Sequence, residues 1–150
     1  MKKEKDLYQV SLKVIIKNSK GEILAMKADP NGSYAGFYDF PGGRIDTDEF
    51  HTPFSEIIKR EIEEEIGNNV VYTLHPKPVA TGRHCIDAKF AKGGKDIHVI
   101  YLFFEAQYVS GQVVISDEHT GFEWLDLSKI KPEQYFKSGN LEGVKIYLGK

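Results

Sequence analysis

Residues 41–68 read PGGRIDTDEFHTPFSEIIKREIEEEIGN, and this stretch joins a glycine turn to a helix of unusual polarity. The paired glycines allow a tight backbone feature that is closed to other residues. A helical pattern follows, because Thr52 can cap, Pro53 suits the first helical position, and Gly67 comes directly after the last periodic residue. The sequence therefore predicts a helix over residues 53–66.

The acidic side chains of this helix do not follow the usual amphipathic pattern. At about 100° per residue its apolar side chains share one arc, which is expected to face the core. Glu61 and Glu65 fall within that arc and Glu64 lies at its side, whereas Glu63 falls on the opposite face. Buried carboxylates are costly unless they are paired or bound to a metal. Glu63, Glu64 and Glu65 also occupy the last turn, where the helix dipole favours cations, so a compensating positive charge is expected.

A divalent cation could supply that charge. Glu61 and Glu65 are one helical turn apart, so both can approach the same ion, and hard oxygen ligands favour Mg²⁺ or Mn²⁺ over Zn²⁺. Arg60 is four residues before Glu64 and can pair with it. Helical geometry alone is equally consistent with a solvated acidic face, which is the usual role of a glutamate run.

The rest of the chain predicts a sheet between helices. The unbroken apolar run Val99–Phe104 is typical of a strand covered on both faces. The tail from Lys131 is predicted to be helical in pieces, interrupted at Gly139 and Gly143. No linker or repeat divides residues 1–150, which predicts one α/β domain. The other predicted strands are a hairpin over 10–16 and 22–27, followed by segments 70–74, 78–85, 97–108, 112–115 and 122–127.

Composition narrows the possible partners. The chain has 150 residues, 20 basic and 22 acidic side chains, and a formal charge of −2, which gives no support to a nucleic-acid or anionic-membrane partner. A single cysteine, Cys85, cannot form an internal disulfide, and the charged start MKKEKD lacks the apolar stretch of a signal peptide. We therefore expect a cytoplasmic protein with no membrane span. The oligomeric state stays open, a homodimer included.

The quoted stretch also resembles a known motif. Gly43, Glu49 and the segment 60–67 fit the signature box of the MutT-like Nudix hydrolases, which reads Gly, five residues, Glu, seven residues, then Arg-Glu-aliphatic-any-Glu-Glu-any-Gly-aliphatic. Two positions depart from it: ten residues separate Glu49 from Arg60, and Asn68 replaces an aliphatic residue. Because Pro53 marks the expected helix start, the three extra residues are placed in the connection 50–52. The resemblance implies a mixed central sheet in an α/β/α sandwich.

The resemblance further implies Mg²⁺-dependent hydrolysis of a nucleoside diphosphate linked to another moiety, such as a nucleoside triphosphate, ADP-ribose or a nucleotide sugar. Bound cations neutralise the anionic diphosphate and lower the pKa of the attacking water. The implied roles are metal binding by Glu61, Glu65, Glu64 and the Gly43 carbonyl, orientation by Arg60 and Glu49, and a general base among Glu64, Glu61 and Glu118.

Alternatives to this activity remain at the level of sequence. Glu118 is read equally well as a solvated loop acid. The unusual spacing after Glu49 keeps open a catalytically silent module that binds a nucleotide or a protein partner on the same scaffold. The leaving moiety is expected to be read by loops such as 29–38 and 90–96.

Overall fold

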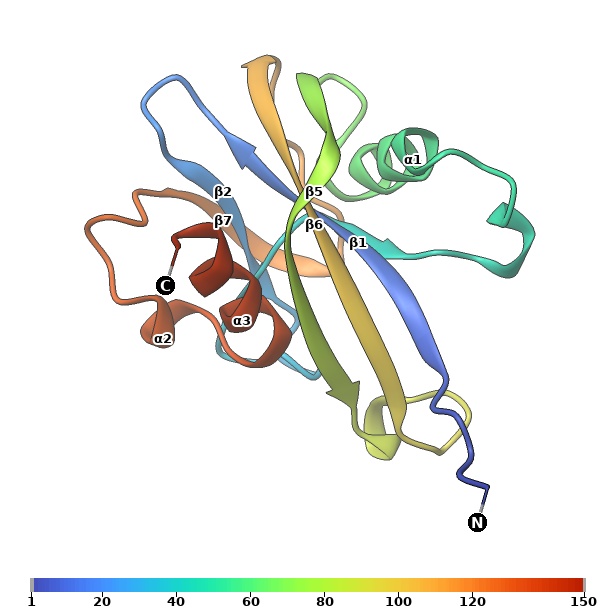
Figure 1. The fold of residues 1–150 in the computed structure, drawn as a ribbon. Coiled ribbons are helices and arrows are strands. Elements are labelled where there is room, and N and C mark those ends of the chain that lie inside the picture. The colour runs from blue at the N-terminus through green and yellow to red at the C-terminus, as the bar shows by residue number, and fades with distance from the viewer. Residues whose placement is uncertain (1, 150) are drawn as a thin grey trace.

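A computed structural model describes residues 2–149 (Figure 1). The helix predicted over 53–66 is confirmed as α1 (Phe54–Ile66). Pro53 is its N-cap residue rather than its first helical residue, and Thr52 makes no capping hydrogen bond. Gly67 ends the helix with a positive φ of 88°, a conformation that glycine adopts without strain. The strands are β1 (Tyr8–Lys17), β2 (Ile23–Ala28), β3 (Tyr38–Asp39), β4 (Gly42–Arg44), β5 (Val71–Ile86), β6 (Ile97–Ser110) and β7 (His119–Leu125), and the other helices are the 3₁₀ turns η1 (Thr47–Glu49) and η2 (Ala88–Phe90), α2 (Pro132–Tyr135) and α3 (Ser138–Tyr147).

These strands form one mixed sheet in the order β3-β2-β1-β6-β5, with β4 also paired to β1 and β7 to β2. Strands β1 and β6 run parallel, in register from Tyr8 opposite His98 to Lys17 opposite Gln107, while the other pairs are antiparallel. The mixed sheet predicted by the resemblance is therefore confirmed. Pairing of β4 with β1 at Leu12 and Lys13 carries the glycine turn to the middle of the sheet.

Helices cover both faces of the sheet, as Figure 1 shows for α1 on one side and α3 on the other. Alternate residues of β1 enter two separate cores: Val14 packs with the apolar arc of α1, whereas Ile15 packs with the cluster that includes Val144 of α3. The central strand β6 contributes to both, since Phe103 lies in the α3 core and Phe104 in the α1 core. The α/β/α sandwich is thus confirmed. The apolar run of β6 does not alternate with polar residues because, as predicted, this strand is covered on both faces.

Two predictions about strands are corrected. Segments 70–74 and 78–85 belong to the single long strand β5, which is irregular in register between Leu74 and Ala80. Segment 112–115 is not a strand. Its neighbourhood instead closes the end of α1, because the Val114 N–H donates to the Ile66 carbonyl and the Ser116 N–H donates to the Glu65 carbonyl. Helix ends leave carbonyls that need such partners.

The C-terminal helices differ from expectation in where they break. The interruption lies between α2 and α3, and Gly139 and Gly143 lie inside α3. A Cβ at Gly143 would collide with the ring of Phe103, and a Cβ at Gly139 would lie 2.7 Å from the Arg83 carbonyl oxygen. The two glycines therefore serve close packing of helix against sheet rather than helix termination. Among residues 2–149, no helix has the length and apolar character needed to cross a bilayer.

Candidate active site

Helix α1 buries the two glutamates that the helical pattern places on its apolar arc. Glu61 and Glu65 are each 8% exposed, whereas Glu63 and Glu64 lie on the solvent side. The burial pattern predicted from the 3.6-residue period is thus confirmed. A solvated acidic face does not describe Glu61 and Glu65.

The glycine turn brings main chain directly against both buried carboxylates. The Gly42 N–H donates to Glu65 Oε2 at 2.9 Å, and Gly42 has a φ of +136° that side-chain-bearing residues rarely adopt. At Gly43, a Cβ would overlap the Glu61 carboxylate, with Oε1 at 2.6 Å. The absence of a side chain at both positions therefore lets Glu61, Glu65 and the turn converge on one spot.

Electrostatics at this spot favour a cation. Burial raises the pKa of Glu65 to about 8, with Asp39 and Glu61 adding repulsion and with Lys13 and the Gly42 N–H opposing them. Burial also raises the pKa of Glu61, against the attraction of Arg60. Two desolvated carboxylates that repel each other are stabilised by a positive ion between them.

Arg60 forms ion pairs with several acidic residues near the buried glutamates. Its guanidinium donates to Glu49 through Nε at 2.9 Å and through Nη2 at 2.6 Å, a bidentate contact, and its Nη1 lies 2.9 Å from Glu61 Oε1. The pKa of Glu49 is lowered, chiefly by these hydrogen bonds. Glu49 ends η1, and residues 50–52 form a turn before α1 in which Phe50 and His51 are exposed. The longer connection therefore leaves the contact between Glu49 and Arg60 intact.

The remaining predicted residues lie at the periphery. The Glu64 side chain is 58% exposed and lies 3.4 Å from Arg60 Nη1. Glu118 lies in an exposed turn before β7, where its N–H donates to Ser116 Oγ, and among the described residues it makes no hydrogen bond or ion pair with the buried glutamates. Within residues 2–149 no three His, Cys, Asp or Glu side chains form a metal-binding group. The side-chain donors that converge are the two carboxylates, a number that suits Mg²⁺, which usually keeps waters and substrate oxygens in its shell.

Two charged residues beside the site were missed by the sequence reasoning. Lys13 of β1 is 7% exposed and pairs with Asp39 of β3 at 3.1 Å. Burial alone would lower the pKa of Lys13, but Asp39 and Glu65 raise it, so the lysine stays charged. Lys13 is interior because its ammonium pairs with Asp39 and lies over the ring of Tyr101, 5.3 Å from the ring centroid. No local pattern in the sequence marks the pairing of Lys13 with Asp39.

A cavity of about 160 Å³ opens beside the glycine turn. Its walls include Lys13, Asp39, Gly43 and the rings of Tyr34 and Tyr101. Gly43 lines this cavity and also lies against the Glu61 carboxylate, so the cavity lies next to that glutamate.

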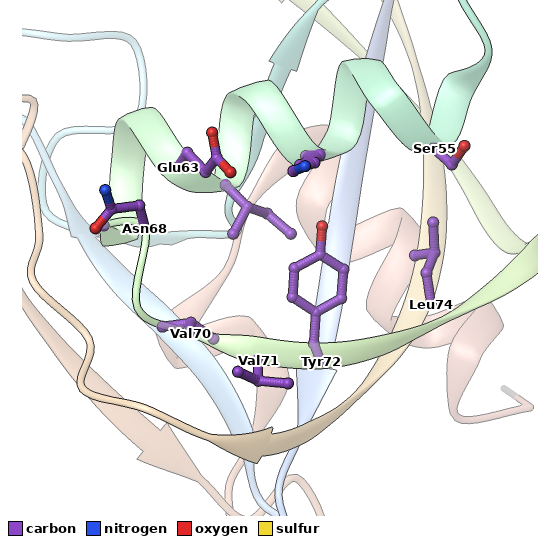
Figure 2. A pocket seen from close by; sticks show the side chains of 10 residues that line it. Ser55, Glu63, Asn68, Val70, Val71, Tyr72 and Leu74 are labelled. Atoms are coloured by element: carbon purple, nitrogen blue, oxygen red, sulfur yellow. The ribbon is translucent and has the colours of Figure 1, made fainter.

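A second, larger groove of about 420 Å³ lies between α1 and the start of β5 (Figure 2). Tyr72 points from β5 toward the helix, and Glu63 and Asn68 lie near the helix end. Val70, Val71 and Leu74 make much of its wall apolar. Neither buried glutamate lines this groove, so it is separate from the candidate active site.

Comparison with known proteins finds a matching family model and several similar proteins. A sequence model of the NUDIX domain matches residues 7–142. The MutT protein from Methanosarcina mazei Go1 is 30% identical, with a TM-score of 0.62 over 85% of this chain and 83% of that one. A MutT NUDIX hydrolase from Burkholderia pseudomallei is 26% identical, with a TM-score of 0.64 over 93% and 99%. The nucleoside triphosphatase NudI of Escherichia coli O139:H28 is 28% identical over 79% of both chains.

The chain therefore belongs to the Nudix family. It is a hydrolase that acts on diphosphate bonds, as the resemblance of residues 41–68 implied.

Proposed function

We propose that the chain is a Mg²⁺-dependent pyrophosphohydrolase that cleaves a nucleoside diphosphate linked to another moiety, with nucleoside triphosphates as the first substrates to test. The convergence of Glu61, Glu65 and the Gly42-Gly43 turn carries this proposal. The similarity to a nucleoside triphosphatase supports the choice of first substrates. The expected small nucleotide substrate, cytoplasmic location and lack of a nucleic-acid partner remain parts of the proposal.

The residues of the chain would have separate roles in binding the metal and orienting its ligands. Glu61 and Glu65 would hold Mg²⁺, with the Gly43 carbonyl and Glu64 as further oxygen donors. When bound, the ion neutralises the diphosphate and lowers the pKa of a coordinated water. Mn²⁺ is expected to substitute, because it also prefers oxygen ligands. Arg60, itself fixed by Glu49, keeps the Glu61 carboxylate in one orientation.

Hydrolysis requires a carboxylate that accepts a proton. The water oxygen bonds to one phosphorus, the bond from that phosphorus to the bridging oxygen breaks, and the water proton passes to the base. Glu64 and Glu118 are exposed and so reach solvent readily, whereas Glu61 is buried and paired with Arg60. Substitution of each by Gln separates them. If Glu118 is the base, Glu118→Gln lowers kcat and removes the acidic limb of its pH profile while the affinity for Mg²⁺ is retained. If the base is Glu61 or Glu64, its substitution lowers kcat and also weakens Mg²⁺ binding, because both are proposed metal ligands.

A substrate panel tests the activity itself. Purified protein is given nucleoside triphosphates, ADP-ribose, nucleotide sugars and dinucleoside polyphosphates, with and without Mg²⁺, and products are separated by chromatography. We expect Mg²⁺-dependent cleavage that falls at least 100-fold in Glu65→Gln and is unchanged in Glu63→Gln, an exposed glutamate of the same helix. Tight nucleotide binding without cleavage of any compound would contradict the proposal and support a catalytically silent module.

A further inference from the structure

The Lys13–Asp39 pair has hydrogen-bonding capacity that the residues described by the structure leave unused. Three donors meet on one oxygen of Asp39: Lys13 Nζ at 3.1 Å, the Phe40 N–H at 2.8 Å and Asn140 Nδ2 at 2.9 Å all reach Oδ1. The other oxygen, Oδ2, accepts no hydrogen bond from the residues described by the structure. Lys13 makes one such bond, although an ammonium carries three donors.

The network fixes the pair in one orientation. Its members come from β1, β3 and α3, so three elements hold the Asp39 carboxylate from one side. Burial would raise the pKa of Asp39, but Lys13 and the hydrogen bonds from Asn140 and Phe40 lower it. The pair therefore presents a charged donor and a charged acceptor side by side.

Both side chains line the 160 Å³ cavity beside Gly43. Pockets for drug-sized ligands usually measure about 300–1,000 Å³, so this one suits a single ring system rather than a whole nucleotide. Tyr34 and Tyr101 supply aromatic walls, and their hydroxyl groups lie 3.1 Å apart. Planar aromatic ligands pack well against such walls.

Charge decides which part of a nucleotide fits this cavity. Lys13 and Asp39 carry opposite charges that cancel, so the pair offers no net positive charge to hold an anion. A phosphate placed here would be repelled by the unpartnered oxygen of Asp39. A neutral ring that offers an acceptor next to a donor would satisfy both members of the pair.

We infer that Lys13 and Asp39 read the hydrogen-bonding edge of the substrate's nucleobase. Lys13 donates to an acceptor on the ring, and Asp39 Oδ2 accepts from the neighbouring N–H. This assignment rests on the proposed function, because it takes the buried glutamates as the place where the diphosphate is cleaved. It makes Lys13 and Asp39 residues that determine specificity, separate from the residues that hold the metal.

Binding without turnover tests this assignment. The four common nucleoside 5′-monophosphates and ribose 5-phosphate, which lacks a base, are titrated into the protein in Mg²⁺ buffer and followed by NMR. We expect at least one monophosphate to bind ten times more tightly than ribose 5-phosphate and to shift the ring signals of Tyr34 and Tyr101. Equal affinities, or no binding of any monophosphate, would overturn the assignment.

The Asp39→Asn variant sharpens the test. An amide can keep the three donors on one oxygen while it replaces the free acceptor with a donor. Affinity for the preferred base should fall about tenfold or more, the rank order of bases should change, and ribose 5-phosphate should bind as before. A uniform loss for all ligands would indicate a merely structural residue and overturn the assignment. Asp6→Asn, which removes an exposed aspartate paired with His98, is the matched control.

Failure of this assignment is distinguishable from failure of the proposed function. Mg²⁺-dependent cleavage with equal kcat/KM for every base would leave the hydrolase intact and remove the role of Lys13 and Asp39. Should Asp39→Asn fail to fold, the comparison of monophosphates with ribose 5-phosphate in the natural chain still decides the question.

Discussion

Replacement of Glu65 by Gln should stabilise the metal-free protein at pH 8. The pKa of Glu65 is raised to about 8 from an ordinary 4.5, with burial as the main cause. Between these pH values the folded chain keeps a proton that the unfolded chain has released. The contribution of Glu65 to stability is therefore most favourable below pH 4.5 and is lost as pH rises to about 8.

The size of this effect follows from the linkage between proton binding and folding. Each pH unit in that interval costs about 1.4 kcal/mol, so the total loss by pH 8 is up to about 4 kcal/mol. For a chain of this length, 1 kcal/mol corresponds to roughly 2–4 °C in Tm. Glu65→Gln should thus raise the Tm of the metal-free protein by about 10 °C at pH 8, and by little at pH 5.

Thermal unfolding in EDTA, followed by circular dichroism from pH 5 to pH 8, measures this difference. Comparison of the variant with the natural chain cancels the titration of every other group. Glu63→Gln, an exposed change on the same helix, should reproduce the natural profile. Addition of Mg²⁺ should then raise the Tm of the natural chain, because the bound ion supplies the positive charge that a proton on Glu65 supplies at lower pH. The Tm of Glu65→Gln should not rise, because the variant lacks this carboxylate. Parallel pH profiles for the natural chain and Glu65→Gln would refute the reasoning.

Three further substitutions test separate parts of the structure. Gly43→Ala should lower Mn²⁺ affinity, measured by electron paramagnetic resonance, by at least tenfold, because the new Cβ would displace the Glu61 carboxylate; unchanged affinity would contradict the convergence of turn and helix. Glu49→Gln should lower kcat by about 10- to 100-fold with little change in Tm, since it weakens the bidentate contact that orients Arg60; steady-state kinetics would show an unchanged kcat if Glu49 had no such role. Gly143→Ala should lower Tm by several degrees through overpacking of about 1–3 kcal/mol against the sheet, seen in thermal melts, whereas a neutral result would contradict the close approach of α3.

The sequence was most informative where one physical rule dominates. The 3.6-residue period places Glu61 and Glu65 among the apolar side chains of α1, and the structure confirms their burial. The unbroken apolar run of β6 predicts cover on both faces, and Phe103 and Phe104 indeed enter different cores. Both features depend on local spacing, which a single sequence displays.

Features that depend on tertiary neighbours were not predictable in the same way. From the sequence alone, Gly143 indicates a helix break. In the structure it lies inside α3, packed closely against the ring of Phe103. Residues 112–115 have the composition of a strand, but their backbone neighbours complete the end of α1. The Lys13–Asp39 pair joins residues 26 positions apart, and neither position carries a local sign of its partner.

The central claim is that Glu61 and Glu65 turn inward to share one divalent cation. A crystal of the protein grown with Mn²⁺ tests it directly, because the anomalous scattering of the ion marks its position. We predict one strong peak within coordinating distance of both carboxylates and of the Gly43 carbonyl. A peak elsewhere, or two carboxylates that point away from each other with no ion between them, would contradict the account.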